Sequence, residues 1–321
     1  TDCIFAEPDY RAEGGMEMEL TREQEEMLAG GHGEAVAYAM RIQAGVGRVF
    51  GAKRMVPITR THVALSVQDA DLWFVEKMLA LGGRCRVSPT VNPSINLAYL
   101  NRHLAEIPKE GLEIVTATNE AYRKIGATLT FNCTPYLQQN IPAFGEVVAF
   151  SESSATPYVN SVLGARSNRE SSQSALCAAV TGLVPEYGLL LDENRRAEVL
   201  VEVKAKVESD FDYQLLGWCY PLKYSGPEVP AFVGIGHRPT PEGFMNFGAE
   251  LNTSGSVAMY HFVGITPEAP TMAAAFGGRE PKIRMEITQE DLDRVREKIC
   301  GKPGKIDFAM FGCPHLSVRQ V

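Results

Sequence analysis

Two cysteines stand in matching contexts, each just beyond an apolar run that predicts a strand. ATLTFN (127–132) leads into Cys133 and then Thr-Pro, and KIDFAMFG (305–312) leads into Cys313 and then Pro-His. In open α/β sheets, ligands bind at the carboxyl ends of the strands, where loops direct side chains into a shared crevice. We therefore expect both sulfurs to face one cavity, as reduced thiols or as thiolates on a metal. Taken singly, a cysteine at a strand end is more often a small buried hydrophobe.

A dense polar run follows a third predicted strand. GEVVAF (145–150) is followed by SESSATPYVNSVLGARSNRE (151–170), whose polar residues would line the same cavity. So many hydrogen-bonding groups are typical of a floor that binds an oxyanion. The candidates are Ser151, Ser153, Ser154, Asn160, Ser161, Arg166, Asn168 and Arg169.

His62 comes shortly after the predicted strand KRMVPI (53–58) and joins the candidate site. Other interpretations apply to several of these positions. A lone histidine is more often structural than a ligand, and Arg166 and Arg169 fit a solvated helix entry about as well as an anion site.

Helices that end in glycine alternate with short apolar strands, which predicts how these residues are positioned. Thr21 and Gln24 form a capping box, DADLWFVEKMLA (69–80) is followed by a Gly pair, and KEGLEIVTATNEAYRKI (109–125) stops at Gly126. ITQEDLDRVREKIC (287–300) repeats the pattern and stops at Gly301. Helix, glycine and strand in alternation predict an α/β fold with a doubly wound, mostly parallel sheet.

The middle of the chain has a different pattern. EVLVEVKAKV alternates with period two, and AFVGIG and SVAMYHFVG resemble buried strands. We interpret residues 1–19 as an N-terminal extension, 20–198 as an α/β domain, 199–270 as an inserted mixed α/β lobe, and 271–321 as a return to the first domain.

Composition narrows the function class. The chain has 321 residues, 31 Lys and Arg against 39 Asp and Glu, and a net charge of -8. This balance argues against a nucleic-acid or anionic-membrane partner and favours small-molecule chemistry. No apolar run approaches the ~18 residues of a spanning helix, and the first fifteen residues do not resemble a secretory signal, so we expect a cytoplasmic protein. Seven scattered cysteines argue against a disulfide framework.

The common short motifs are missing. The sequence contains no CxxC, HExxH, GxSxG or Walker motif, which excludes the commonest zinc, serine-hydrolase and P-loop classes. The GxG of AFVGIGHRP lacks the third glycine of a dinucleotide site, and two prolines interrupt the expected helix start.

Several longer runs resemble the large, catalytic subunit of the aconitase X family. They are NCTPY (132–136), SESSATPYVNSVLGARSNRE (151–170), LDENR (191–195), VGITPEAP (263–270) and FGCPHLS (311–317), and they occur in the family's order. The resemblance extends from about Leu20 to the end of the sequence. It implies an aconitase-like fold and an iron-sulfur cluster held by three cysteines, of which Cys133 and Cys313 would be two.

The resemblance also implies parts that these 321 residues do not contain. The third cluster ligand belongs to a more C-terminal segment, and a small swivelling subunit or domain, separate or fused, brings a catalytic serine. We therefore expect the isolated chain to be inactive.

Dehydration fits this set of residues. A cluster on three thiolates leaves one iron without a protein ligand, and that iron is a Lewis acid for a substrate hydroxyl and carboxylate. His62 would position or protonate the departing hydroxyl, with Ser153 and Ser154 also placed in the catalytic set. The arginines and the other Ser and Asn residues would bind the substrate and its developing charge.

We interpret the chain as an iron-sulfur hydro-lyase that removes water from a small anionic hydroxy acid. The segment RSNRESSQSAL (166–176) and its two arginines favour mevalonate 5-phosphate over the alternative substrate cis-3-hydroxy-L-proline. An alternative of another class is a non-catalytic iron-sulfur or regulatory subunit. A third is a redox thiol protein, which would need cysteines of low pKa.

Overall fold

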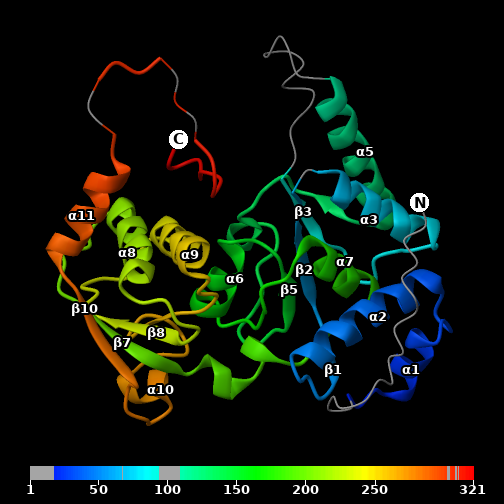
Figure 1. Cartoon of the computed structure of the whole chain (residues 1–321), viewed down its shortest axis with the longest axis horizontal. Coiled ribbons are helices and arrows are strands. Elements are labelled where there is room, and N and C mark those ends of the chain that lie inside the picture. Colours follow the sequence, from blue (N-terminus) through cyan, green and yellow to red (C-terminus); the bar gives the residue numbers. More distant parts are fainter. Residues whose placement is uncertain (1–17, 67, 94–108, 302–303, 308, 310) are drawn as a thin grey trace.

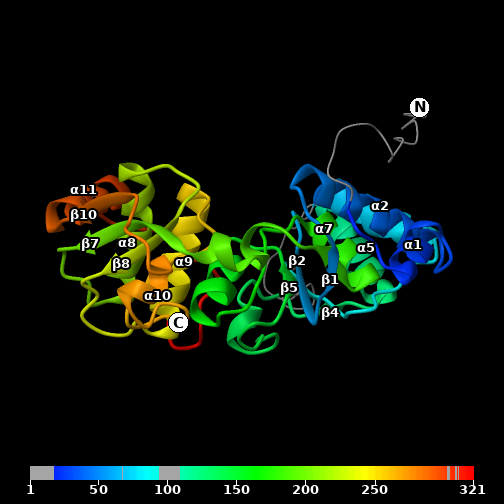
Figure 2. The same ribbon diagram turned by 90° about the horizontal axis from the view of Figure 1, so that it is seen from below.

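The computed structural model describes residues 18–66, 68–93, 109–301, 304–307, 309 and 311–321. These residues form two lobes, each built on a four-stranded sheet (Figure 1). Seen from below, the lobes lie end to end along the long axis of the molecule (Figure 2). The α/β class with parallel sheets that the sequence predicts is confirmed.

The first lobe has the strand order β4-β3-β2-β5, and every neighbouring pair is parallel. Because the strands are parallel, their carboxyl ends meet at one edge. The strands are β2 (Arg60–Ala64), β3 (Thr90–Asn92), β4 (Thr128–Leu129) and β5 (Val148–Phe150). Its helices are α1 (Arg22–Leu28), α2 (Glu34–Val49), α3 (Asp69–Ala80), α5 (Lys109–Ile125) and α7 (Ser172–Thr181), and a small antiparallel pair joins β1 (Met55–Pro57) to β6 (Leu183–Pro185).

Short helical turns lie between the strands of the first lobe and before the first strand of the second. They are η1 (Pro135–Leu137), α6 (Ala155–Pro157), the π-helical turn η2 (Tyr158–Val162), η3 (Gly188–Leu190) and η4 (Asp192–Arg195). η1 follows Cys133, and α6 and η2 follow β5, so these turns carry the chain away from the carboxyl ends of β4 and β5.

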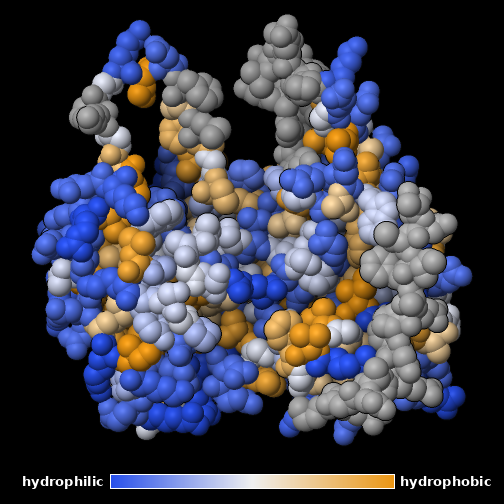
Figure 3. Space-filling model, in the orientation of Figure 1, coloured by the Kyte–Doolittle hydropathy of each residue, from blue (hydrophilic) through white to orange (hydrophobic). Residues whose placement is uncertain are grey.

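The second lobe has the strand order β10-β7-β8-β9, again parallel throughout. Its strands are β7 (Ala197–Val203), β8 (Val229–Val233), β9 (His261–Phe262) and β10 (Ile283–Ile287), and its helices are α8 (Asp210–Lys223), α9 (Pro241–Gly255), α10 (Met272–Phe276) and α11 (Gln289–Ile299). In the view of Figure 3, the outer surface of this lobe around β10 and α10 is largely hydrophilic.

One apolar cluster is shared by the two lobes. Phe150 and Tyr158 of the first lobe belong to the same buried cluster as Phe244 and Phe262 of the second. The Tyr158 ring meets the Phe244 ring edge-on, with centroids 6.4 Å apart. Such burial stabilises by about 25 cal/mol per Å² of apolar surface removed from water, so the lobes hold each other in place.

Local sequence fixes the ends of several helices. Ser171 caps α7 by a reciprocal capping box with Ser174, and Thr288 caps α11 with Asp291 in the same way. At Gly217 the helices α8 and α9 approach so closely that an added Cβ would lie 2.5 Å from the Phe247 carbonyl oxygen. Only glycine permits that contact without a shift.

The structure differs from two expectations. β10 pairs with β7, so residues 283–299 extend the second sheet, whereas the sequence interpretation returned 271–321 to the first domain. Within that range, His315 does return to the first lobe, where it is hydrogen-bonded to Cys133. The described part of KIDFAMF forms no strand. Periodicity could not reveal these differences, because a short amphipathic strand carries no mark of the sheet that it joins.

Candidate active site

Cys133 lies just beyond β4, is buried, and is joined to the C-terminal segment by a reciprocal pair of hydrogen bonds. Its backbone N–H donates to Nδ1 of His315 at 3.1 Å, and the His315 backbone N–H donates to the Cys133 sulfur at 3.1 Å. Cys313, two positions before His315, is exposed, and the Ser153 side chain opposes the rise in the pKa of its thiol. The structure thus brings Cys313 to the end of the first sheet, next to Cys133, although the segment before Cys313 is a loop.

The pKa of both thiols lies above the ordinary value of a cysteine. Burial raises the pKa of Cys133 to about 12, and the charges of Glu152 and Cys313 add to this shift while the His315 backbone N–H opposes it. Burial also raises the pKa of Cys313, again with Glu152 contributing. A redox thiol needs the opposite shift, so these values disfavour the redox alternative.

The loop after β5 contains a carboxylate that the sequence analysis did not single out. Glu152 is half-buried, and Asn92 Nδ2 donates to its Oε2 at 3.4 Å. Burial raises the pKa of Glu152. The residue stood within the run SESSATPYVN, so its position after a strand was the available signal, but the serines around it drew the interpretation toward hydrogen-bond donors.

The serines beside Glu152 have different roles. Ser151 is buried, donates to the His62 carbonyl oxygen at 2.9 Å and accepts from the Ala64 N–H at 2.7 Å, so it joins β5 to β2. Ser154 is also buried, and its hydroxyl donates to the Cys133 carbonyl oxygen at 3.4 Å. Of the three predicted serines in this loop, Ser153 is the one that is partly exposed beside a cysteine thiol.

His62 follows β1, as the sequence predicts, but it lies inside the next strand, β2, and is fully buried. Its Nδ1 is 2.8 Å from the Thr90 hydroxyl, and its Nε2 has no hydrogen-bond partner among the described residues. Burial lowers the pKa of His62 to about 4, with Asn92 and Thr90 opposing the shift. The imidazole is therefore neutral near pH 7 and is separated from solvent.

A cavity of about 350 Å³, which we call the β5 pocket, opens beside this loop. It is lined by side chains from both lobes, because Asn252 of α9 closes one side and donates from Nδ2 to the Ser153 carbonyl oxygen at 2.9 Å. The lining residues that matter here are Ser151, Glu152, Ser153, Arg169, Glu170 and Asn252.

The two candidate arginines differ in their surroundings. Arg166 donates to the Leu190 carbonyl oxygen at 2.8 Å and pairs with the Asp192 carboxylate, so its guanidinium holds the η3–η4 loop. Arg169 is exposed and has no ion-pair partner among the described residues. Its side chain lines the β5 pocket and is the cation available to an anionic ligand there.

Asn160, Ser161 and Asn168 are occupied by the fold. Asn160 donates to the Ser167 and Ala258 carbonyl oxygens at 2.9 and 3.1 Å, and Ser161 accepts from the Tyr260 N–H at 2.9 Å. Asn168 donates to the Tyr187 carbonyl oxygen and accepts from the Leu189 N–H. The substrate-binding prediction requires these three side chains in the β5 pocket, but the structure does not place them there.

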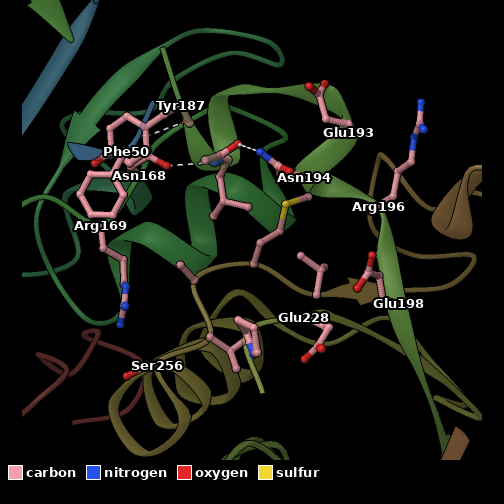
Figure 4. Close-up of a pocket in the computed structure, with 17 residues that line it drawn as sticks. Phe50, Asn168, Arg169, Tyr187, Glu193, Asn194, Arg196, Glu198, Glu228 and Ser256 are labelled. Atoms are coloured by element: carbon pink, nitrogen blue, oxygen red, sulfur yellow. Dashed lines mark hydrogen bonds between the residues drawn. The ribbon is translucent and has the colours of Figure 1, made fainter. Parts of the chain in front are cut away.

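A second, larger cavity of about 520 Å³ lies on the other side of Arg169 (Figure 4). Here Phe50 and Tyr187 stack with ring centroids 4.6 Å apart, and Glu193, Glu198 and Glu228 line the wall. Arg169 lines both cavities, and in Figure 4 its side chain points away from Phe50 and Tyr187. Two arginines, Arg169 and Arg196, line this cavity together with the three carboxylates. We keep the β5 pocket as the candidate site because it lies in the loop that directly follows β5.

The donor set fits part of an iron-sulfur site. Cys133 and Cys313 offer two neighbouring sulfurs, while His62 Nε2, Asn92 Oδ1 and Asn252 Oδ1 are buried polar atoms without a partner among the described residues. Within the described ranges, no three His, Cys, Asp or Glu side chains gather closely enough to hold a metal. The two thiols could supply two cluster ligands, and a further ligand would have to come from elsewhere.

Two models of one protein family match the sequence of this chain. The first-domain model of aconitase X matches residues 17–193, and the second-domain model of aconitase X matches residues 197–297. The chain belongs to the aconitase X family. The boundary between the two models falls just before β7, where the second sheet begins.

Curated members of the aconitase X family include proteins with two different names. The chain is 39% identical over 308 residues to the phosphomevalonate dehydratase large subunit of Thermococcus kodakarensis, covering 95% of this chain and 75% of the relative. It is 38% identical to the cis-3-hydroxy-L-proline dehydratase of Pseudomonas aeruginosa, covering 92% of this chain and 51% of that relative. The chain thus spans about three quarters of the first relative and about half of the second.

A solved aconitase X has the same fold. The holo-form crystal structure of Thermococcus kodakaraensis aconitase X superposes with a TM-score of 0.83 at 37% identity, covering 94% of this chain and 75% of that one. Among the helices that the structure describes, none is both long and apolar enough to cross a membrane.

Proposed function

We propose that this chain is the catalytic part of an aconitase X hydro-lyase that removes water from a small anionic hydroxy acid in the β5 pocket. The observation that carries the proposal is the meeting of three features at one strand edge. These are the neighbouring sulfurs of Cys133 and Cys313, the guanidinium of Arg169 without an ion-pair partner among the described residues, and the half-buried carboxyl of Glu152. The dehydratase names of the relatives support the reaction class.

Mevalonate 5-phosphate is our preferred substrate. Phosphomevalonate dehydratase large subunits from three archaea are 35 to 39% identical to the chain, and the alignments cover about three quarters of each of these relatives. Arg169 supplies a charge-assisted donor of the kind that binds phosphate or carboxylate. The alternative, cis-3-hydroxy-L-proline, is supported by a relative of nearly equal identity.

An iron-sulfur cluster is the cofactor that we propose, with Cys133 and Cys313 as two of its ligands. When bound, it would supply a Lewis acid for the substrate's oxygen atoms. The chain's own residues have separate tasks: Arg169 binds the anionic group, and Asn252 and Ser151 form the walls of the pocket. The apolar cluster that joins the lobes fixes the distance between those walls.

A small subunit is the partner that we propose, because the relatives are named large subunits. We propose that it contributes the catalytic serine, and that the remaining cluster ligand comes from outside the described residues. Since His62 is buried and neutral, its contact with the departing hydroxyl stays a prediction, as does the cytoplasmic location.

The test combines metal analysis with turnover. The chain is joined to the C-terminal part of a phosphomevalonate dehydratase large subunit and purified without oxygen together with the small subunit, and iron, sulfide and dehydration of both substrates are measured. We expect iron-dependent dehydration of mevalonate 5-phosphate, and loss of both iron and activity in Cys133→Ser. Cys300→Ser is the matched control, because Cys300 is exposed at the end of α11.

Two other outcomes would favour other functions. A stable cluster without turnover of either substrate would support the non-catalytic alternative. Full activity in Cys133→Ser would show that the reaction does not take place at this strand edge.

A further inference from the structure

The two faces of the first sheet differ in character. On one face, Val63 of β2 and Val91 of β3 are buried in the same apolar cluster as Phe74 of α3 and Tyr122 of α5. Helices therefore cover this face in the way that is usual for a parallel sheet.

The opposite face is polar. Side chains alternate between the faces along a strand, and His62, Thr90 and Thr128 are in register across β2, β3 and β4. On this face His62 Nδ1 is 2.8 Å from the Thr90 hydroxyl, and Ser88 Oγ is 3.2 Å from Thr128 Oγ1. Strands of parallel sheets are usually apolar on both sides, so this row of polar side chains indicates a task other than core packing.

A cavity of about 460 Å³, which we call the amino-end pocket, lies where these strands begin. Its lining includes Thr59 and Arg60 at the start of β2, Arg86 before β3, and Thr128 and Thr130 around β4. It shares no described lining residue with the β5 pocket, which follows the carboxyl end of β5. The volume is within the range of sites that hold small molecules.

The charged residues that line the amino-end pocket have one sign. Arg60 and Arg86 belong to its lining, and no aspartate or glutamate does among the described residues. The β5 pocket, in contrast, has two glutamates in its lining, and the cavity of Figure 4 has three. Of these three cavities, the amino-end pocket is the one whose charges favour an anion.

Each of the two arginines has an acidic neighbour but keeps donors for a ligand. Arg60 donates from Nε to Glu146 at 3.1 Å, and no hydrogen bond joins its two Nη groups to another described residue. Arg86 approaches Glu23 only to 3.5 Å, and both of these side chains are more than half exposed. An exposed pair of this kind contributes little to stability, so a ligand can replace it at small cost.

The hydroxyl groups of the pocket offer acceptors. Thr90 is already engaged, because the Asn140 amide donates to its hydroxyl at 3.0 Å. Thr59 and Thr130 donate to backbone carbonyl oxygens at 3.5 and 3.3 Å, and no described residue donates to their hydroxyl oxygens. A hydroxyl oxygen has two lone pairs, so both threonines can accept a hydrogen bond from a hydroxyl group of a ligand.

We propose that the amino-end pocket binds a small organic phosphate that carries hydroxyl groups. Arg60 and Arg86 bind the phosphate through charge-assisted hydrogen bonds, and Thr59 and Thr130 accept from the hydroxyl groups. Two arginines match the charge of a phosphate monoester, which is about −2 at pH 7, better than that of a single carboxylate. The site is separate from the β5 pocket and does not depend on the proposed function.

Calorimetric titration of the chain with glycerol 3-phosphate tests the proposal. We expect saturable binding that Arg60→Ala and Arg86→Ala each weaken by about 10-fold or more, the effect of losing a charge-assisted hydrogen bond. Arg284→Ala in β10 is the matched control and should keep Kd within about 3-fold. Arg284 is as exposed as Arg86 and likewise pairs with a glutamate, Glu280, but it lies in the second lobe.

Two further comparisons make the test specific. Arg169→Ala removes the cation of the β5 pocket and should leave the binding of glycerol 3-phosphate within about 3-fold of the parent. Methyl phosphate has the same charged group without free hydroxyl groups, and we expect it to bind at least about 3-fold more weakly than glycerol 3-phosphate.

Several results would overturn the proposal. These are no saturable binding, equal loss in the Arg284→Ala control, or loss in Arg169→Ala with full binding in the other variants, which would place the ligand in the β5 pocket. Methyl phosphate binding as tightly as glycerol 3-phosphate would contradict the role of the threonines. If Arg60→Ala fails to fold, Arg86→Ala decides the matter, because Arg86 is an exposed side chain. The titration measures binding and not turnover, so its result is independent of whether the chain dehydrates a substrate.

Discussion

At the residue scale, Arg166 and Arg169 lie close together in the sequence but differ in whether an acidic side chain pairs with them. Arg166 has Asp192, whereas Arg169 has no acidic partner in the part of the chain that the structure describes. Their sequence contexts are alike, so only the fold separates a structural arginine from one that can bind a ligand.

This difference gives a paired prediction. Arg169→Ala should weaken binding of mevalonate 5-phosphate by about 1.5 to 3 kcal/mol, the contribution of a charge-assisted hydrogen bond, and should leave the melting temperature nearly unchanged. Arg166→Ala should lower the melting temperature, because it releases the η3–η4 loop, and should leave the binding of mevalonate 5-phosphate nearly unchanged. Calorimetric titration and thermal unfolding of both variants would test this, and equal loss of affinity in the two would contradict it.

His62 leads to a prediction about pH. Its pKa is about 4 in the folded protein against 6.5 for an ordinary histidine, so the unfolded chain binds more protons between these values. Stability is therefore fully present above pH 6.5 and is lost as the pH falls toward 4, by up to about 3 kcal/mol. Urea unfolding at pH 7 and pH 4.5 should show a smaller loss for His62→Gln than for the parent.

The carboxyls with raised pKa values, Glu152 and Glu170, act in the opposite direction. They are present in both proteins, so the difference between parent and variant isolates His62. An identical pH dependence in the two proteins would mean that His62 is accessible to protons in the folded state.

At the element scale, the α8–α9 contact depends on one glycine. A methyl group at position 217 would lie 2.5 Å from the Phe247 carbonyl oxygen, so Gly217→Ala should destabilise the protein by about 1 to 3 kcal/mol. Gly45 in α2 has nothing within 4 Å of an added Cβ, and Gly45→Ala should stabilise by about 0.5 to 1 kcal/mol. Denaturant midpoints of the two variants should move in opposite directions.

The elements also show how far the sequence could be interpreted. Alternating helices and strands predicted the parallel sheets, and the capping box at Thr21 placed one helix start correctly. KIDFAMF was predicted as a strand, but its described residues have no neighbouring strand to pair with and remain in a loop where Ile306 and Phe311 are exposed. An apolar run becomes a strand only where another strand offers hydrogen bonds.

The position of the candidate site was predictable in part, because it depends on where the strands end. The strand-end rule pointed to Cys133 and to the loop after Phe150, because both follow strands of one parallel sheet. It could not reveal that Asn160 and Ser161 are occupied, since their partners Ala258 and Tyr260 are about 100 positions away in the chain.

At the scale of the whole molecule, the shared apolar cluster predicts that the lobes unfold together. The chain has two tryptophans, Trp73 in α3 of the first lobe and Trp218 in α8 of the second. Trp73→Phe and Trp218→Phe each leave one reporter, and we expect coincident urea transitions from both. Two separate midpoints would show that the lobes are independent folding units.

The same apolar cluster predicts the effect of removing one large side chain at its centre. Tyr158 is buried between the lobes and stacks on Tyr136 with ring centroids 4.3 Å apart. Tyr158→Ala should lower the free energy of unfolding by about 3 to 5 kcal/mol, as for other large aromatic deletions, and both tryptophans should report this loss. A change seen by only one tryptophan would contradict the shared core.

The C-terminal segment is attached to both lobes, since Ser317 donates to Glu242 of α9 at 2.8 Å while His315 is bonded to Cys133. The Cys133 amide proton therefore has its acceptor in a side chain 182 positions away and not in a sheet ladder. Its exchange with deuterated solvent requires only that the segment lift off, whereas the amides of β2 require a larger opening. The exchange rate of the Cys133 amide thus measures how often the C-terminal segment detaches from the first lobe. A ligand that stabilises the docked segment should slow this exchange.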